Sequence, residues 1–196
     1  MSTAPVTAEH AVALTRAWVD RVVIGLNLCP FAKAPQVKGR IRYVCSEATT
    51  PQALLHALNT ELLHLADTPI DVVETTLLIH PFVLTDFAQY NAFLDRAESA
   101  VDALELSGVL QIASFHPQYR FAGTRPADVT NATNRSPFPM LHLIREQSID
   151  RAVAAFPEAE AIYQANMATM QRLGKQGIAA LLAQCAQEAV VQTPGD

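Results

Sequence analysis

Two histidines that each precede a proline are the first candidates for chemistry in this chain. His80 follows the apolar run 72–79, and His116 follows the apolar run 109–115. A residue before proline is biased to an extended backbone, so each histidine is expected where a strand stops. Ligands of open parallel sheets bind beyond the carboxyl ends of the strands, and the two imidazoles could therefore face one cleft. The alternative is that each histidine only caps its strand.

A second group of ionisable side chains follows Ser136 and Pro137. These two residues match the N-cap and the first position of a helix, which is predicted over 137–154. Two of its residues, His142 and Glu146, are four apart on one helical face and could bind the same metal ion. The alternative is a simple side-chain contact on a solvated face. The predicted metal ligands are His80, His116, His142 and Glu146, and the candidate cofactor is a divalent metal, zinc or iron.

The segment that leads into this predicted helix carries amide, hydroxyl and guanidinium groups. Backbone amides at a helix N-terminus favour an anion, and Arg135, with Arg145, could hold a phosphate or carboxylate through two hydrogen bonds. The alternative is a loop whose side chains hydrogen-bond to their own backbone. The predicted substrate-binding residues are Asn131, Asn134, Arg135 and Ser136.

Cys29, with Pro30 after it, matches the start of a short helical turn. A thiolate at such a position is stabilised, and Lys33 would add to this effect. The thiol could then act as a nucleophile or redox group, with His116 or His142 as general base. The alternative is a buried, inert cysteine. The predicted catalytic residues are His116, Cys29 and Arg145.

The composition narrows the classes of partner. The chain has 196 residues, half of them hydrophobic, which suits one globular domain over 1–196 with frayed ends at about 1–7 and 188–196. Its net charge of -5 disfavours nucleic acid and anionic membranes, so a small anionic molecule is the expected ligand. The start of the chain resembles no signal peptide, no stretch is suited to span a membrane, and the three cysteines form no Cys-x-x-Cys pair. A cytoplasmic protein is expected, and its oligomeric state stays open.

Helical and strand patterns alternate along the chain. Helices are predicted over 8–24, between Thr50 and Asp67, and over 86–106, 137–154 and 158–173, and strands over 36–47, 72–79 and 109–115. The stripe of Leu14, Trp18 and Val22 marks the first helix. Strands separated by such helices usually pair in parallel, so the predicted fold is α/β, with a small, mainly parallel three-stranded sheet flanked by helices. A ferredoxin-like α+β sheet is the alternative.

Three blocks of sequence resemble a known family. They are Gly25 to Phe31, Ala113 to Pro117 and Thr133 to Pro137, and they closely resemble the uncharacterised bacterial family DUF1415 over nearly the whole chain. The resemblance implies no activity, and His80 lies outside its motifs. The site candidates that stand in its recognisable motifs are Cys29, His116, Asn134, Arg135, Ser136, His142, Arg145 and Glu146.

Three functions follow from these residues. The leading hypothesis is a small-molecule enzyme with a histidine-rich, metal-dependent cleft that acts on an anionic substrate. The second is a metal-free Cys/His enzyme or a thiol redox protein. The third is a non-catalytic module that binds an anion or a partner protein through the same loop.

Overall fold

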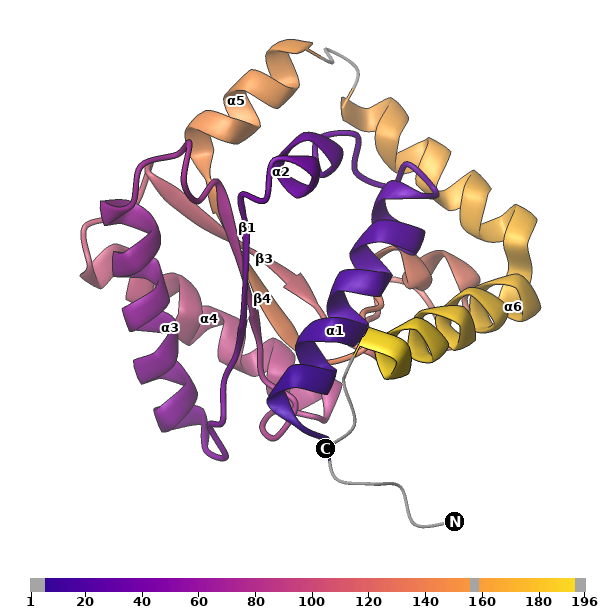
Figure 1. The fold of residues 1–196 in the computed structure, drawn as a ribbon, viewed down its shortest axis with the longest axis horizontal. Helices are drawn as coiled ribbons and strands as arrows, with labels where there is room; N and C mark the ends of the chain where they lie inside the picture. The colour runs from indigo at the N-terminus through magenta and orange to yellow at the C-terminus, as the bar shows by residue number, and fades with distance from the viewer. Residues whose placement is uncertain (1–5, 156–158, 193–196) are drawn as a thin grey trace.

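The fold is a four-stranded sheet between two layers of helices (Figure 1). The computed structural model describes residues 6–155 and 159–192. In it α3 and α4 cover one face of the sheet, and α1 and α6 cover the other. The strands are β1 (Ile41–Cys45), β2 (Thr75–Ile79), β3 (Leu110–Phe115) and β4 (Met140–Arg145). The helices are α1 (Ala8–Trp18), the π-helical η1 (Val19–Ile24), α2 (Lys33–Val37), α3 (Pro51–Asp67), α4 (Phe87–Ala103), the 3-10 helix η2 (Val129–Asn134), α5 (Glu146–Ala155) and α6 (Ala159–Gln192).

The sheet is mixed, with the strand order β1-β2-β4-β3. The pair β1–β2 is parallel, whereas β4 is antiparallel to both of its neighbours. It follows that β1, β2 and β3 point the same way, and their carboxyl ends meet at one edge of the sheet. That edge is where His80 and His116 follow their strands.

Local sequence signals start the helices on both faces. The side chains of Thr7, Thr50 and Asp86 each accept a hydrogen bond from a backbone amide in the first turn of α1, α3 and α4. Such N-caps satisfy amides that have no partner within the helix. Helix α6 is broken at Gly174, whose φ of 61° and ψ of -178° are non-helical, so its two parts run in different directions (Figure 1).

Side chains of alternate strand residues pack into two separate hydrophobic cores, one on each face of the sheet. On the α3–α4 side, Leu78, Leu141 and Leu143 are fully buried among the leucines of α3. On the α1–α6 side, Leu77 and Met140 pack with residues of α1 and α6. Strand β2 is buried throughout, as its apolar, β-branched run predicts.

The α/β class with flanking helices is confirmed, but the predicted three-stranded, mainly parallel sheet was wrong, because a fourth strand lies between β2 and β3 and is antiparallel to both. The predicted helix 137–154 is instead strand β4 followed by α5, which begins at Glu146. Leu141 and Leu143 point to one core and His142 between them points to the other face, which is the alternation of a strand. This strand pairs with β2 on one side and with β3 on the other. The ferredoxin-like alternative is also wrong, because the chain runs β-α-β-α-β-β and not β-α-β-β-α-β.

The ends of the chain extend further than expected within the described residues. Thr7 caps α1, and α6 continues to Gln192. The predicted helix 158–173 forms the first part of α6, although residue 158 lies outside the described residues. The remainder of the predicted frayed ends, 1–5 and 193–196, also lies outside them. A search of the described helices finds none with the length and apolar character needed to cross a membrane.

Candidate functional site

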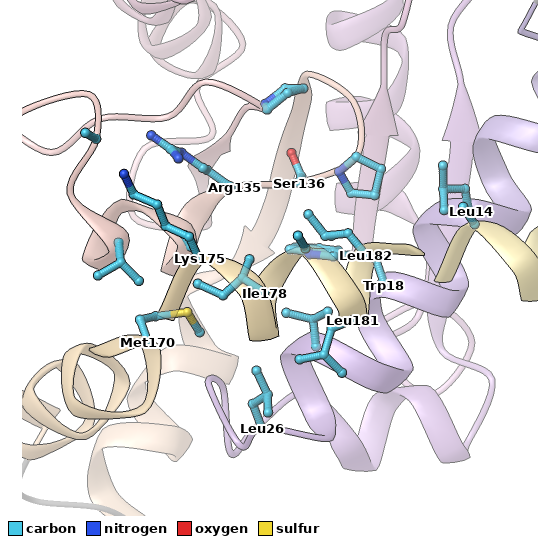
Figure 2. A pocket seen from close by; sticks show the side chains of 18 of the residues that line it. Leu14, Trp18, Leu26, Arg135, Ser136, Met170, Lys175, Ile178, Leu181 and Leu182 are labelled. Atoms are coloured by element: carbon cyan, nitrogen blue, oxygen red, sulfur yellow. The ribbon is translucent and has the colours of Figure 1, made fainter. Parts of the chain in front are cut away.

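A cavity of about 610 Å³ lies on the α1–α6 side of the molecule (Figure 2). Its walls come from α1 and η1, from η2 with the loops around it, and from α6. All of its lining residues are apolar except Arg135, Ser136 and Lys175. The volume falls within the range of about 300–1,000 Å³ that is usual for small-molecule sites. We refer to it as the α1–α6 cavity.

Two helical stripes form opposite walls of the α1–α6 cavity. On α1 and η1 the stripe is Leu14, Trp18 and Val22, which recur every four residues as the first-helix pattern predicts. On the second part of α6 most of the lining residues also share one helical face. Those on this face are Lys175, Ile178, Ala179, Leu182 and Ala186, and Leu181 lines the cavity from beside it.

The two cations of the α1–α6 cavity have no acidic partner within the described residues. Arg135 is half-buried, and its Nε and Nη2 donate to the carbonyl oxygens of Tyr119 (3.2 Å) and Pro126 (2.7 Å). Burial lowers the pKa of Arg135, and no carboxylate counteracts this effect. Lys175 is exposed and forms no ion pair, and no Asp or Glu lines the cavity. Figure 2 shows both side chains on the same side of the cavity.

The predicted anion loop divides into lining residues and structural residues. Arg135 and Ser136 line the cavity, and the hydroxyl of Ser136 donates to the carbonyl oxygen of Phe138 (2.6 Å). Asn131 is fully buried, and its side chain bonds to the backbone of Phe121 and Arg125. Asn134 donates from Nδ2 to the carbonyl oxygen of Ser114 (3.3 Å). The two asparagines therefore hold the loop, as the alternative interpretation expects, and only Arg135 and Ser136 reach the cavity.

Trp18 is the single tryptophan of the chain and lines the α1–α6 cavity. Only 2% of its surface is exposed, and its ring meets the ring of Phe115 edge-on, with the centroids 5.7 Å apart. Its Nε1 is buried without a hydrogen-bond partner. Its fluorescence therefore reports on this cavity alone.

His80 and His116 do meet at one edge of the sheet, but they lie within the α3–α4 core. Both are fully buried, and the ring of Tyr90 lies 5.8 Å from that of His80 and 5.0 Å from that of His116. Phe87 covers His116 further, with ring centroids 5.4 Å apart. The structure therefore places the two imidazoles under α4 and not in the α1–α6 cavity.

Backbone groups determine which nitrogen of each of these imidazoles carries the proton. Nδ1 of His80 donates to the carbonyl oxygen of Val83 (3.0 Å), and its buried Nε2 has no partner. The amide of Gln118 donates to Nδ1 of His116 (3.0 Å), so Nε2 carries the proton and donates to the carbonyl oxygen of Leu84 (3.2 Å). Burial lowers the pKa of His80 to about 4, and it also lowers the pKa of His116. Both imidazoles follow the ends of their strands and bond to the backbone there, and burial disfavours the charged form of each.

The residues predicted on one helical face are separated because they belong to β4 and α5. His142 faces the α1–α6 side, where its Nε2 donates to the hydroxyl of Thr75 (2.7 Å), which in turn donates to Leu143. Burial lowers the pKa of His142 to about 4. Glu146 starts α5, so the predicted spacing of four residues on a helix is wrong. Across residues 6–155 and 159–192, no three His, Cys, Asp or Glu side chains form a group that could hold a metal ion.

Arg145, a predicted catalytic residue, holds the end of α3. It is 5% exposed, and its Nη2 donates to the carbonyl oxygens of Leu65, Thr68 and Val73. Burial lowers its pKa, while nearby Glu74 raises it. Its Nη2 is therefore occupied by the backbone, while its buried Nε has no hydrogen-bond partner among the described residues.

Cys29 lies in the turn between η1 and α2, and not at the start of a helix, because α2 begins at Lys33. Burial raises the pKa of its thiol, and the backbone amides of Phe31 and Ala32 offset this only in part. The turn is at the end of the sheet where β1 begins, whereas His116 follows the opposite end of its strand (Figure 1). The structure therefore does not bring together the predicted pair of Cys29 and His116.

The three blocks that carry the family resemblance converge on the α1–α6 cavity. Their lining residues are Leu26 from the first block, Pro117 from the second, and Arg135, Ser136 and Pro137 from the third. A family described as "Protein of unknown function (DUF1415)" matches residues 10–180. The chain belongs to the DUF1415 family. No curated protein and no solved structure matches it.

Two functional candidates of this DUF1415 chain were missed by sequence reasoning. Trp18 was recognised only as part of a helical stripe, and Lys175 lies just beyond the predicted helix 158–173. The stripe of α6 that begins at Lys175 has its own helical period, which could have indicated a second buried face. That this face meets α1 could not be read from the local sequence.

Proposed function

We propose that the protein binds a small amphipathic organic anion in the α1–α6 cavity. The observation that carries the proposal is a pair of cations, Arg135 and Lys175, at one side of an otherwise apolar cavity and without an acidic partner. An apolar body would fill the cavity, and an anionic group would pair with the two cations.

The charge of the chain supports this ligand. Acidic residues outnumber basic ones by 19 to 14, yet none of those in the described part of the chain lines the cavity. Removing a guanidinium from water is unfavourable unless an opposite charge or hydrogen bonds compensate for it. Arg135 uses two of its nitrogens on carbonyl oxygens, and its third nitrogen is not engaged by any carboxylate of the described residues. An exogenous carboxylate, sulfonate or phosphate would supply the missing partner.

The same lining supports binding more than catalysis. Ser136 is the only hydroxyl in the wall, and its proton already goes to Phe138. No His, Cys, Asp or Glu lines the cavity, so no side chain there could act as a general base near neutral pH. The ligand would be held, carried or sensed.

A matched pair of dyes tests the proposal. The anionic dye 8-anilinonaphthalene-1-sulfonate and neutral N-phenyl-1-naphthylamine share an aromatic body, but only the first has a sulfonate. Titration is followed by dye fluorescence and by the emission of Trp18. The sulfonate should bind more tightly, and Lys175→Gln or Arg135→Gln should weaken its binding about tenfold or more, because each removes a charged hydrogen bond. Binding of the neutral dye should not change.

Two controls make this result specific. Arg172→Gln removes an exposed charge from the same helix without touching the cavity. Arg135→Lys keeps the positive charge but removes the guanidinium, so it separates the effect of lost charge from the effect of a weakened loop. Equal affinity for the two dyes, or an equal loss of affinity in Arg172→Gln and Lys175→Gln, would contradict the proposal.

A further inference from the structure

We propose that the ligand of the α1–α6 cavity is a free acyl anion. Its unbranched aliphatic chain lies between the stripes of α1 and α6, its carboxylate is at Arg135 and Lys175, and its methyl end is near Leu14. This inference rests on the proposed function and adds the class of ligand and the residue that limits its length.

The hydrogen-bonding groups of the wall exclude a polar ligand body. Away from the two cations, only Ser136 and Trp18 carry side-chain hydrogen-bonding groups. The hydroxyl of Ser136 is bonded to Phe138, and Nε1 of Trp18 is covered. A sugar, nucleoside or peptide would lose its hydrogen bonds to water here without replacing them, which is unfavourable. An aliphatic chain loses none.

The composition of the wall also favours an alkyl chain over a flat aromatic ring. Trp18 is the sole aromatic residue among the lining residues, and its ring packs edge-on with Phe115. A planar ligand would therefore lack a second aromatic surface on which to stack. Leucine, isoleucine, valine and methionine supply eight of the nineteen described lining residues, alanine and proline supply seven more, and this aliphatic wall matches a flexible hydrocarbon.

The stripes make the cavity long. From Lys175 to Ala186 the stripe of α6 extends for about 16 Å, at 1.5 Å per helical residue, and the other stripe runs from Leu14 through the π-helical η1 to Leu26 in the turn after it. Arg135 and Lys175 lie at one side of the view in Figure 2, and Leu14 lies at the opposite side. A chain with its charge at the cations therefore points its other end toward Leu14.

The net charge of the protein favours a free acyl anion over an acyl chain still embedded in a bilayer. At a net charge of -5 the protein as a whole is repelled by an anionic membrane surface. A dissolved carboxylate can instead reach two cations that no acidic side chain of the cavity wall screens.

A chain-length series tests this inference. Octanoate, dodecanoate and hexadecanoate, each below its micelle-forming concentration, compete with the anionic dye, and dodecylammonium serves as the matched cation. Affinity should rise about fourfold per methylene until the chain fills the cavity, and then stop rising. Dodecylammonium should not compete.

Substitutions of Leu14 test the end of the cavity. Leu14→Ala should shift the optimum toward hexadecanoate, and Leu14→Phe should shift it toward octanoate. The exposed Leu63→Ala on α3 is the matched control and should leave the series unchanged. Thermal unfolding of each variant shows whether the fold is intact, and Leu14→Phe keeps the test valid if Leu14→Ala unfolds.

The remaining outcomes overturn either this inference or the proposed function. If the anionic dye binds through Arg135 and Lys175 but no acyl chain competes, the acyl inference fails and the proposed function stands. If the affinity for the anionic dye is the same in the Arg135→Gln and Lys175→Gln variants as in the unaltered protein, the proposed function fails. Stronger binding to phosphatidylcholine vesicles than to free dodecanoate would overturn the choice of a free ligand. A change of Trp18 emission with protein concentration alone would show that a second copy occupies the cavity.

Discussion

The two faces of the sheet are covered in opposite ways. On the α3–α4 side, Leu54, Leu58 and Leu62 are fully buried, and the histidines, Tyr90 and Arg145 bond to backbone groups. On the α1–α6 side, a cavity of about 610 Å³ lies beside the core that α1 and α6 share. The first side stabilises the fold, and the second leaves room for a ligand.

Arg145 and Arg135 illustrate this difference between the two sides of the sheet. Arg145 is 5% exposed, contacts three carbonyl oxygens and has Glu74 nearby. Arg135 is half-buried beside an apolar cavity and has no acidic neighbour. The sequence analysis placed Arg135 in the anion loop and Arg145 as a second donor and a catalytic residue. What separates them in the structure is the charge around them, because Glu74 raises the pKa of Arg145 whereas no carboxylate of the described residues does so for Arg135.

The largest expected effect is the loss of Arg145 from the α3–α4 side. Arg145→Met should lower the free energy of unfolding by about 3–4 kcal/mol, because three carbonyl oxygens at the end of α3 lose their charged donor. Urea unfolding measures this loss, and dye affinity of the folded variant should not change. A loss below about 1 kcal/mol would show that these bonds do not stabilise the fold.

Protonation of His80 should be the next largest effect. Its folded-state pKa, about 4, lies below the ordinary value of 6.5, so the unfolded chain binds the proton more readily. The neutral ring costs nothing above pH 6.5, and stability falls as the pH drops from about 6.5 to about 4, with a loss of about 2 kcal/mol at pH 5. Urea unfolding at pH 7.5 and pH 5 measures the loss.

A variant and a direct titration separate His80 from other groups. In His80→Asn the difference between the two pH values should shrink by about 2 kcal/mol, while exposed His56→Gln controls for loss of a histidine as such. An imidazole resonance of His80 that titrates above pH 6 would contradict the prediction.

Removal of one hydroxyl gives a smaller effect on the same side. The hydroxyl of Tyr90 donates to the carbonyl oxygen of Met140 (2.8 Å) and accepts from the amide of Phe115 (3.1 Å). Tyr90→Phe leaves both groups unpaired and should lower the free energy of unfolding by about 1.5 kcal/mol. Exposed Tyr163→Phe should have no measurable effect. Equal unfolding midpoints for the two variants would show that the two hydrogen bonds of the Tyr90 hydroxyl do not stabilise the fold.

The sequence predicts those parts of the fold that depend on local signals. Thr50 and Asp86 start helices as N-caps, and the run before His80 forms a buried strand, because capping and apolar patterning act over a few residues. Strand β4 was missed because Ser136 and Pro137 imitate a helix start. Its pairing with β2 and β3 depends on residues about 25 to 70 positions away, as between Ser114 and Leu141 or Thr75 and Ile144.

The candidate site was predictable only in part for the same reason. The shared edge of His80 and His116 follows from parallel strand direction, which the structure confirms. Their burial depends on Tyr90 and Phe87 of α4, which no local pattern connects to them. Lys175 reaches the cavity because α6 turns at Gly174 and packs across α1, and this contact is also non-local.

The smallest expected effect concerns Cys29, which lies in the turn between η1 and α2 and does not line the cavity. Because burial raises the pKa of its thiol, less thiolate is present near neutral pH than in a free cysteine. In a Cys45→Ser, Cys185→Ala background, iodoacetamide should alkylate Cys29 more slowly than it alkylates glutathione, as mass spectrometry measures. A saturating ligand in the cavity should leave that rate unchanged. A rate above that of glutathione would restore Cys29 as a candidate nucleophile, and protection by the ligand would extend the binding site to the turn before α2.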